Sequence, residues 1–181
     1  MRQTKKNSQH GFTLMETMIA MSILAVGILG LAAMLGDSLA YMKGSQDDFI
    51  AQQKAEEAAE AIFTAKYNAN ATFAQVSNFG VGNPAGLFLP GPLALTVPGP
   101  DGLVGSVNDT AAPLASIIMP GPDKILGTAD DVLVPLTNFK RTIAITTVVG
   151  KPNLKQVVIT IDYTAGRWTR QYVLTTYVSS F

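Results

Sequence analysis

The chain has 181 residues, enough for one globular domain and an appended segment, and it carries 13 basic and 13 acidic residues. Charged residues make up 14% of the sequence, against about 25% in typical soluble domains, and apolar residues make up 48%. The chain has no cysteine and a single histidine, His10, which excludes disulfide scaffolds, cysteine-ligated metal sites and cysteine nucleophiles. The neutral charge balance argues against a strongly basic nucleic-acid-binding protein, and the low charge argues against a disordered polyelectrolyte.

The N-terminus combines a basic leader with a long apolar run. Residues 1–11 contain Arg2, Lys5 and Lys6 and no acid, whereas residues 12–35 carry one charged side chain, Glu16. As a helix, this run would span about 36 Å, which is enough for a bilayer core of about 30 Å. The basic leader predicts a cytoplasmic N-terminus, with the remainder of the chain on the other side of the membrane.

Three ordinary explanations fit this segment less well. A cleavable secretory signal has an apolar region of about 7–15 residues followed by a small-residue cut site, and the run at 12–35 is longer and lacks such a site. A plain signal anchor fits the length but leaves Glu16 unexplained. A buried helix of a soluble domain is disfavoured because the run is apolar on every side.

The residues His10-Gly11-Phe12-Thr13-Leu14-Met15-Glu16 resemble the processing motif of type IV prepilins. In that family a short basic leader ends in glycine, a prepilin peptidase cuts before the next apolar residue and methylates it, and the fifth mature residue is glutamate. The resemblance implies cleavage between Gly11 and Phe12, N-methylation of Phe12, and pairing of Glu16 with the N-terminus of a neighbouring subunit during assembly. The alternative for Glu16 is a carboxylate near the membrane interface without a partner, although a lone intramembrane carboxylate is usually functional.

A long helix is expected to run from the apolar segment into the domain that follows, because no proline interrupts residues 12–83. From residue 37 to residue 67 the pattern becomes amphipathic, which predicts a stripe that packs on a sheet. The stripe comprises Phe49, Ile50, Ala55, Ala58, Ala59, Ile62 and Phe63. We expect the helix to end near residues 68–77, where Asn-Ala-Asn breaks the pattern.

Residues 80–139 contain 9 glycines and 9 prolines, which predicts a loop-rich region with short strands at 93–97 and 132–136. Within it, PGPDGLVGSVND (98–109) and PGPDKILGTADD (120–131) form a quasi-repeat with six of twelve positions identical. The acidic and amide side chains of the repeat offer oxygen ligands for Ca²⁺, although their spacing is not that of an EF-hand. They are Asp123, Asp130 and Asp131 in the second copy, and Asp101, Asn108 and Asp109 in the first. The alternative is a pair of turns in which aspartate side chains accept hydrogen bonds from backbone N–H groups.

From residue 141 onward, apolar residues alternate with polar ones, with turns at 151–153 and 165–166. This pattern predicts three antiparallel strands with one buried face. The resemblance implies a pilin-like α+β fold, in which a long N-terminal helix with a membrane-spanning first half packs on a C-terminal antiparallel sheet. Trp168 alternates onto the apolar face and is expected in the core, the alternative being a surface contact site with Arg167 and Arg170.

The expected organisation is a cleaved leader at 1–11, a transmembrane and assembly helix at 12–36, and a periplasmic or extracellular domain at 37–181. That domain divides into the Gly/Pro-rich loops at 80–139 and the sheet at 140–181. An enzyme is not expected, because cleavage after Gly11 would leave a chain without histidine or cysteine and the sequence has no glycine-rich phosphate motif. Nucleic acid is not an expected partner, since the basic residues Lys140, Arg141, Lys151, Lys155, Arg167 and Arg170 are scattered along the strands and turns.

The resemblance predicts a minor pilin, most similar to the pilus-modification type, or a type II secretion pseudopilin. Its expected partners are prepilin peptidase, other pilins or pseudopilins, the inner-membrane assembly platform and, before assembly, inner-membrane lipid. The precursor is expected in the inner membrane, and the processed protein in a periplasmic or cell-surface filament. The alternative class is a membrane-anchored, calcium-tuned binding module outside any filament, which needs neither a cut at Gly11 nor Glu16.

Overall fold

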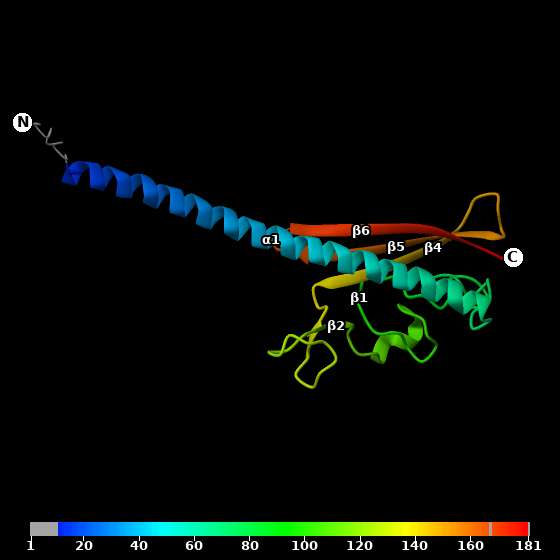
Figure 1. Ribbon diagram of the computed structural model, residues 1–181. Coiled ribbons are helices and arrows are strands. Elements are labelled where there is room, and N and C mark those ends of the chain that lie inside the picture. The colour runs from blue at the N-terminus through cyan, green and yellow to red at the C-terminus, as the bar shows by residue number, and fades with distance from the viewer. Residues whose placement is uncertain (1–10, 167, 181) are drawn as a thin grey trace, which may run out of the picture. The chain divides into compact units, whose positions relative to one another are not determined.

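The computed structural model describes residues 11–166 and 168–180, so residues 1–10 of the expected leader and Arg167 lie outside the described residues. The chain divides into two compact units, Met1–Met42 and Lys43–Phe181. One long helix, α1 (Leu14–Tyr67), contributes to both units, and the strands follow it in the sequence (Figure 1). The predicted α+β fold is therefore confirmed, with a long N-terminal helix and a C-terminal antiparallel sheet.

In the second unit, α1 buries one stripe of small and apolar side chains. The buried positions recur at three- and four-residue spacing, which is the period of one helix face, and they are Gly44, Asp47, Ile50, Ala51, Ala55, Ala58, Ala59, Ile62 and Ala65. The expectation that Phe49 belongs to this stripe is wrong, because its side chain is 59% exposed. Phe49 is one residue before Ile50, so the helical rotation of about 100° per residue carries it away from the buried face. The helix ends at Tyr67, directly before the Asn-Ala-Asn segment that predicted its end.

The main sheet has four antiparallel strands in the order β1-β4-β5-β6. They are β1 (Leu93–Ala94), β4 (Phe139–Thr147), β5 (Leu154–Ala165) and β6 (Trp168–Ser179). The three C-terminal strands were predicted from their alternation, and their register places Ile143 opposite Ile159 and Ile159 opposite Leu174. β1 is shorter than the strand predicted at 93–97, and only an isolated bridge between Thr96 and Leu114 continues it.

Trp168 is 72% exposed, so the prediction that it lies in the core is wrong. It is the first residue of β6 and pairs with Ala165 across the turn that joins β5 and β6. β6 pairs with β5 alone among the described strands, which makes it an edge strand. At this end of the sheet Gly44 of α1 faces Arg170 and Ala165, and the Trp168 side chain is left exposed on the edge strand. Alternation predicts which face of the sheet a residue lies on, but it does not predict whether another element covers the residue there.

A second, two-stranded sheet is formed by β2 (Ser116–Met119) and β3 (Val132–Pro135), which lie on either side of the second repeat copy. β3 was predicted and β2 was not. A short 3-10 helix, η1 (Val107–Ala111), ends the first repeat copy. The two copies therefore belong to different local settings within the second unit.

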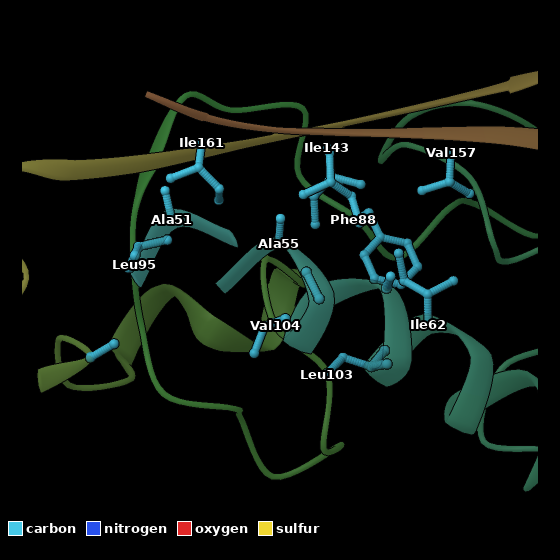
Figure 2. Close-up of a cluster of buried hydrophobic side chains, with 14 of the residues drawn as sticks. Ala51, Ala55, Ile62, Phe88, Leu95, Leu103, Val104, Ile143, Val157 and Ile161 are labelled. Atoms are coloured by element: carbon cyan, nitrogen blue, oxygen red, sulfur yellow. The ribbon is translucent and has the colours of Figure 1, made fainter. Parts of the chain in front are cut away.

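The core of the second unit is a single cluster of buried apolar side chains (Figure 2). The helix contributes small alanines, Ala51 and Ala55, together with Ile62, while the strands contribute branched residues such as Ile143 and Val157. Small side chains on the helix allow its backbone to lie close to the bulky residues of the sheet. The Gly/Pro-rich region completes this core with Phe88, Leu95, Leu103 and Val104, which are each no more than 1% exposed.

Two polar side chains attach the loop after α1 to the sheet. Asn78 bridges two residues on the edge of β4: its Nδ2 donates to the carbonyl of Ile143 at 2.7 Å, and its Oδ1 accepts from the amide of Ile145 at 2.8 Å. Lys155 of β5 is 8% exposed and donates from Nζ to the carbonyl oxygens of Phe73, Ala74 and Val76. These bonds satisfy backbone groups that no strand partner or helix reaches.

Candidate functional site: the start of the N-terminal helix

The start of α1 is a reciprocal hydrogen-bonded cap between Thr13 and Glu16. A carboxylate oxygen of Glu16 accepts from the backbone N–H of Thr13 at 3.0 Å and from its hydroxyl at 3.1 Å. In return, the Thr13 hydroxyl oxygen accepts from the backbone N–H of Glu16 at 3.3 Å. This is the capping-box arrangement, with threonine at the cap and glutamate three residues later.

Gly11 and Phe12 lie immediately outside the helix, in a segment without regular secondary structure. The Phe12 side chain is 87% exposed, and a Cβ added to Gly11 would meet no atom within 4 Å. The predicted cleavage bond between these two residues is therefore in non-helical chain, directly before the cap. A peptidase that binds its substrate in an extended form could reach this bond without unwinding the helix.

The helix of the first unit presents an exposed and predominantly apolar surface. Every described residue from 11 to 42 is exposed, including large side chains such as Leu24, Leu31 and Leu35. Among the described residues, α1 is the one helix whose length and composition suit a membrane span, and its most apolar window has no buried residue. Apolar surface of this extent, uncovered within the chain, suits a membrane anchor or a contact with other helices.

The predicted calcium ligands are placed as hydrogen-bond acceptors within their own loops. Asp123 accepts from the amide of Ile125 at 2.8 Å, and Asp131 accepts from the amide of Gly127 at 2.6 Å. Asp130 accepts from the hydroxyl of Thr128 at 2.6 Å, and this hydrogen bond lowers the pKa of the Asp130 carboxyl. In the part of the chain that the structure describes, no group of three or more carboxylate, histidine or cysteine side chains gathers as a metal site.

In the first copy, Asp101 accepts from the amide of Leu103 at 3.0 Å, and Asp109 is buried and accepts from Gly105 and Ser106. The Nδ2 of Asn108 donates to Asp101 at 3.0 Å, so this pair is engaged inside the loop. These contacts are the ones expected from the alternative interpretation, in which the aspartate side chains accept hydrogen bonds from backbone N–H groups of turns. Calcium binding remains a prediction, which calcium titration with thermal melting would test.

The basic residues of the sheet do not form a continuous surface. Arg141 is 3% exposed, and burial lowers the pKa of its guanidinium while the nearby charges of Glu57 and Asp109 oppose that effect. Lys155 is buried beneath the loop after α1, and Arg170 forms an ion pair with Asp48 at 2.7 Å. Of the residues in the alternative surface site, Trp168 is exposed and Arg170 is paired with Asp48. Arg167, the third residue of that site, lies outside the described residues.

Two neighbouring carboxylates at the beginning of the buried helix stripe have opposite pKa shifts. A hydrogen bond from the Tyr163 hydroxyl, at 2.6 Å, and the Arg170 guanidinium lower the pKa of Asp48. Burial raises the pKa of Asp47, one of whose carboxylate oxygens has no hydrogen-bond partner. Sequence reasoning missed the Asp48 contacts, because Tyr163 and Arg170 lie more than a hundred residues away in the chain, and it missed the burial of Asp47, which depends on the packed structure.

The capping box was also missed, although its signal is local. Threonine followed three residues later by glutamate, directly before an apolar run, is a sequence signature of a helix start. The same four residues serve the prepilin resemblance, which drew the interpretation of Glu16 toward assembly alone. Glu16 consequently has a structural contact within its own chain in addition to the predicted contact with a neighbour.

The family described as the prokaryotic N-terminal methylation motif matches residues 6–32 of the chain. No curated protein and no solved structure matches the chain. The matched span contains Gly11, Phe12 and Glu16 and most of the exposed apolar helix. Proteins with this motif are structural rather than enzymatic, and the motif implies processing by a prepilin peptidase and assembly with other pilins. With this motif, the long apolar helix and the antiparallel sheet that follows it, the chain is a type IV prepilin-like protein.

Proposed function

We propose that the chain is a minor pilin or pseudopilin that is cut between Gly11 and Phe12, methylated at Phe12 and assembled into, or primes, a type IV pilus or type II secretion pseudopilus. The observation that carries this proposal is the exposed apolar helix that begins within the methylation motif and continues beyond it. Such a helix is stable in lipid before assembly and can exchange lipid for the apolar helices of neighbouring subunits afterwards. The assembly platform of the inner membrane would carry out that exchange.

Glu16 has a physical reason to act once the leader is removed. Cleavage would create a positively charged α-amino group at Phe12, next to the N-terminus of α1, where the helix dipole is also positive. A carboxylate at position 16 compensates that positive charge, either within its own chain or from a neighbouring subunit. We therefore assign Glu16 two roles: it caps its own helix, and its charge directs subunit pairing.

The two roles of Glu16 separate in a pair of variants. Glu16→Gln retains a side-chain oxygen that can accept the capping-box hydrogen bond but removes the charge, whereas Glu16→Ala removes both. If the charge directs pairing, both variants are processed normally but are depleted about equally from sheared filaments. If only the cap matters, Glu16→Gln is incorporated like the unmodified protein and Glu16→Ala is not, which would contradict the charge role.

The proposal as a whole is tested by mass spectrometry of the N-terminal peptide, from membranes and from sheared filaments. A peptide that begins at N-methylated Phe12 in the filament fraction supports processing and assembly together. The same peptide found only in membranes favours a pseudopilin or an assembly primer. An intact N-terminus that is absent from filaments would refute the proposal in favour of a membrane-anchored binding module.

A further inference from the structure

The two copies of the quasi-repeat fold as the same loop. In both copies the aspartate at the fourth position accepts from the backbone N–H two residues later, at 3.0 Å for Asp101 and 2.8 Å for Asp123. The last aspartate of each copy accepts from the N–H of the glycine four residues earlier, which both copies share, at 2.5 Å for Asp109 and 2.6 Å for Asp131.

Backbone hydrogen bonds and dihedral angles recur as well. The carbonyls of Gly99 and Gly121 accept from the residue three positions later, at 2.9 and 3.0 Å. The donors of these bonds, Gly102 and Lys124, have φ angles of 72° and 59°, and Gly105 and Gly127 have φ angles of 74° and 89°. Lys124 adopts a left-handed conformation that glycine occupies in the first copy, so the loop geometry is kept where the side chain disfavours it.

The apolar pair at the tip of this loop is buried in one copy and exposed in the other. Leu103 and Val104 are 1% and 0% exposed, whereas Ile125 and Leu126 at the equivalent positions are 60% and 62% exposed. The buried pair belongs to the hydrophobic cluster that contains the alanine face of α1, and Figure 2 draws both residues beside that helix. The chain therefore shows what this loop packs against when its tip is covered: an apolar helix face with small side chains.

The exposed copy is part of a larger apolar hairpin surface. Its flanking strands, β2 and β3, also present large exposed side chains, namely Ile118, Met119, Val132 and Leu133. Their exposed fractions are 59%, 44%, 53% and 65%. Ile118 pairs with Leu133 and Met119 with Val132, so each face of the two-stranded sheet carries one exposed apolar pair in addition to the exposed tip. Exposed apolar side chains gathered in this way on a folded domain often mark an interaction site.

We propose that the hairpin 116–135 is a docking element, which places Ile125 and Leu126 against an apolar, small-residue helix face of a second prepilin-like subunit. This inference rests on the proposed function, because that function supplies neighbouring subunits with exposed apolar helices. The contact reproduces between chains the packing that Leu103 and Val104 make with α1 within the chain. The packing of Leu103 and Val104 on α1 supports a helix as the partner, and it gives no support for a lipid surface or an unrelated soluble protein.

The test is site-specific photo-crosslinking in cells that produce the full chain. A photoreactive phenylalanine analogue replaces Leu126 in one sample and Val149 in another. Val149 is the matched control because it is an apolar side chain, 98% exposed, in the turn between β4 and β5. We expect position 126, and not position 149, to cross-link to the N-terminal helix of a second prepilin-like subunit, identified by mass spectrometry of the product. A cross-link to lipid or to an unrelated protein, or equal cross-linking from both positions, would overturn the proposal.

Substitutions provide the second readout. Because both tip side chains are solvent-exposed, Ile125→Thr with Leu126→Gln should leave the thermal unfolding temperature unchanged, as should Val149→Thr. The double variant should lower incorporation into filaments about tenfold or more, because two apolar side chains lose their burial, and Val149→Thr should not. Normal incorporation of the double variant would refute the docking role.

The N-terminal peptide from the same cells separates the two proposals. If Phe12 is processed and the unmodified protein is in filaments, a negative result at position 126 counts against the hairpin alone. If the N-terminus remains intact, the proposed function has failed on its own, and the hairpin proposal, which rests on it, is overturned unless position 126 still cross-links to the N-terminal helix of a second prepilin-like subunit.

Discussion

Lys155→Met is the substitution with the largest expected effect on the stability of the second unit. The ammonium group lies 2.7 Å from the carbonyl oxygen of Phe73, 3.2 Å from that of Ala74 and 2.8 Å from that of Val76. Methionine keeps most of the aliphatic stem and its packing but donates no hydrogen bond, so three carbonyls lose their charged donor.

The size of the effect follows from two opposing terms. Hydrogen bonds to a charged group contribute about 1.5–3 kcal/mol each, and burying the ammonium offsets several kcal/mol of that gain. Only the hydrogen bond to Val76 is buried, whereas those to Phe73 and Ala74 are part-buried, so removing the donor leaves a net destabilisation of about 3 kcal/mol. For a unit of this size, about 2–4 °C per kcal/mol applies, so we expect the unfolding temperature to fall by about 10 °C.

Thermal unfolding of the full chain in detergent, followed by circular dichroism, measures this shift. Lys151→Met is the matched control, because Lys151 is exposed in the turn before β5 and its replacement should change the free energy of unfolding by no more than about 0.5 kcal/mol. If Lys155→Met and Lys151→Met unfold at the same temperature, the three carbonyl contacts do not stabilise the fold and the reasoning is refuted.

Three further stability predictions follow from the described contacts. The folded-state pKa of Asp47 is raised above its ordinary value of 3.8, so its charge destabilises the fold fully above that raised pKa, and this destabilisation disappears as the pH falls from there to 3.8. Asp47→Asn should therefore raise the unfolding temperature at pH 7, with the gain shrinking toward pH 4, and a loss of stability at pH 7 would contradict this. The pKa of Asp48 is lowered, so the stability that its charge contributes is present above 3.8 and is lost as the pH falls through the lowered value. Asp48→Asn should therefore destabilise the fold at pH 7 by less than about 1 kcal/mol, because the pair is half exposed, and the loss should shrink as the pH falls below 3.8. Asn78→Ala removes the hydrogen bonds to Ile143 and Ile145 and should cost about 2 kcal/mol, with faster hydrogen exchange at the Ile145 amide; unchanged exchange at that amide would show that Asn78 does not protect this edge.

The predictable parts of the fold are those specified by local patterns. Alternation along 141–178 predicted β4, β5 and β6, and Asn-Ala-Asn predicted the end of α1, because both signals lie within a few residues. The methylation motif is similarly local, and the family match at residues 6–32 supports it. The cleavage, methylation and assembly roles of Gly11, Phe12 and Glu16 stay predictions, which the peptide and variant experiments address.

What the sequence did not predict depends on contacts between distant segments. Trp168 follows the alternation of the apolar face, but it is exposed at the first position of the edge strand β6, and only the packed structure shows that exposure. Leu103 and Ile125 occupy the same position of nearly the same loop, yet one is buried and the other exposed, because their surroundings differ. Local sequence specifies the shape of the loop, and the chain on either side determines what the loop meets.

The capping box at Thr13 and Glu16 has a consequence for the order of events in maturation. Both partners of the cap lie on the C-terminal side of the bond between Gly11 and Phe12, so the groups that begin the helix are all retained by the shortened chain. Removal of the leader would therefore expose a helix end that is already closed, with no refolding step between the cut and entry into the filament.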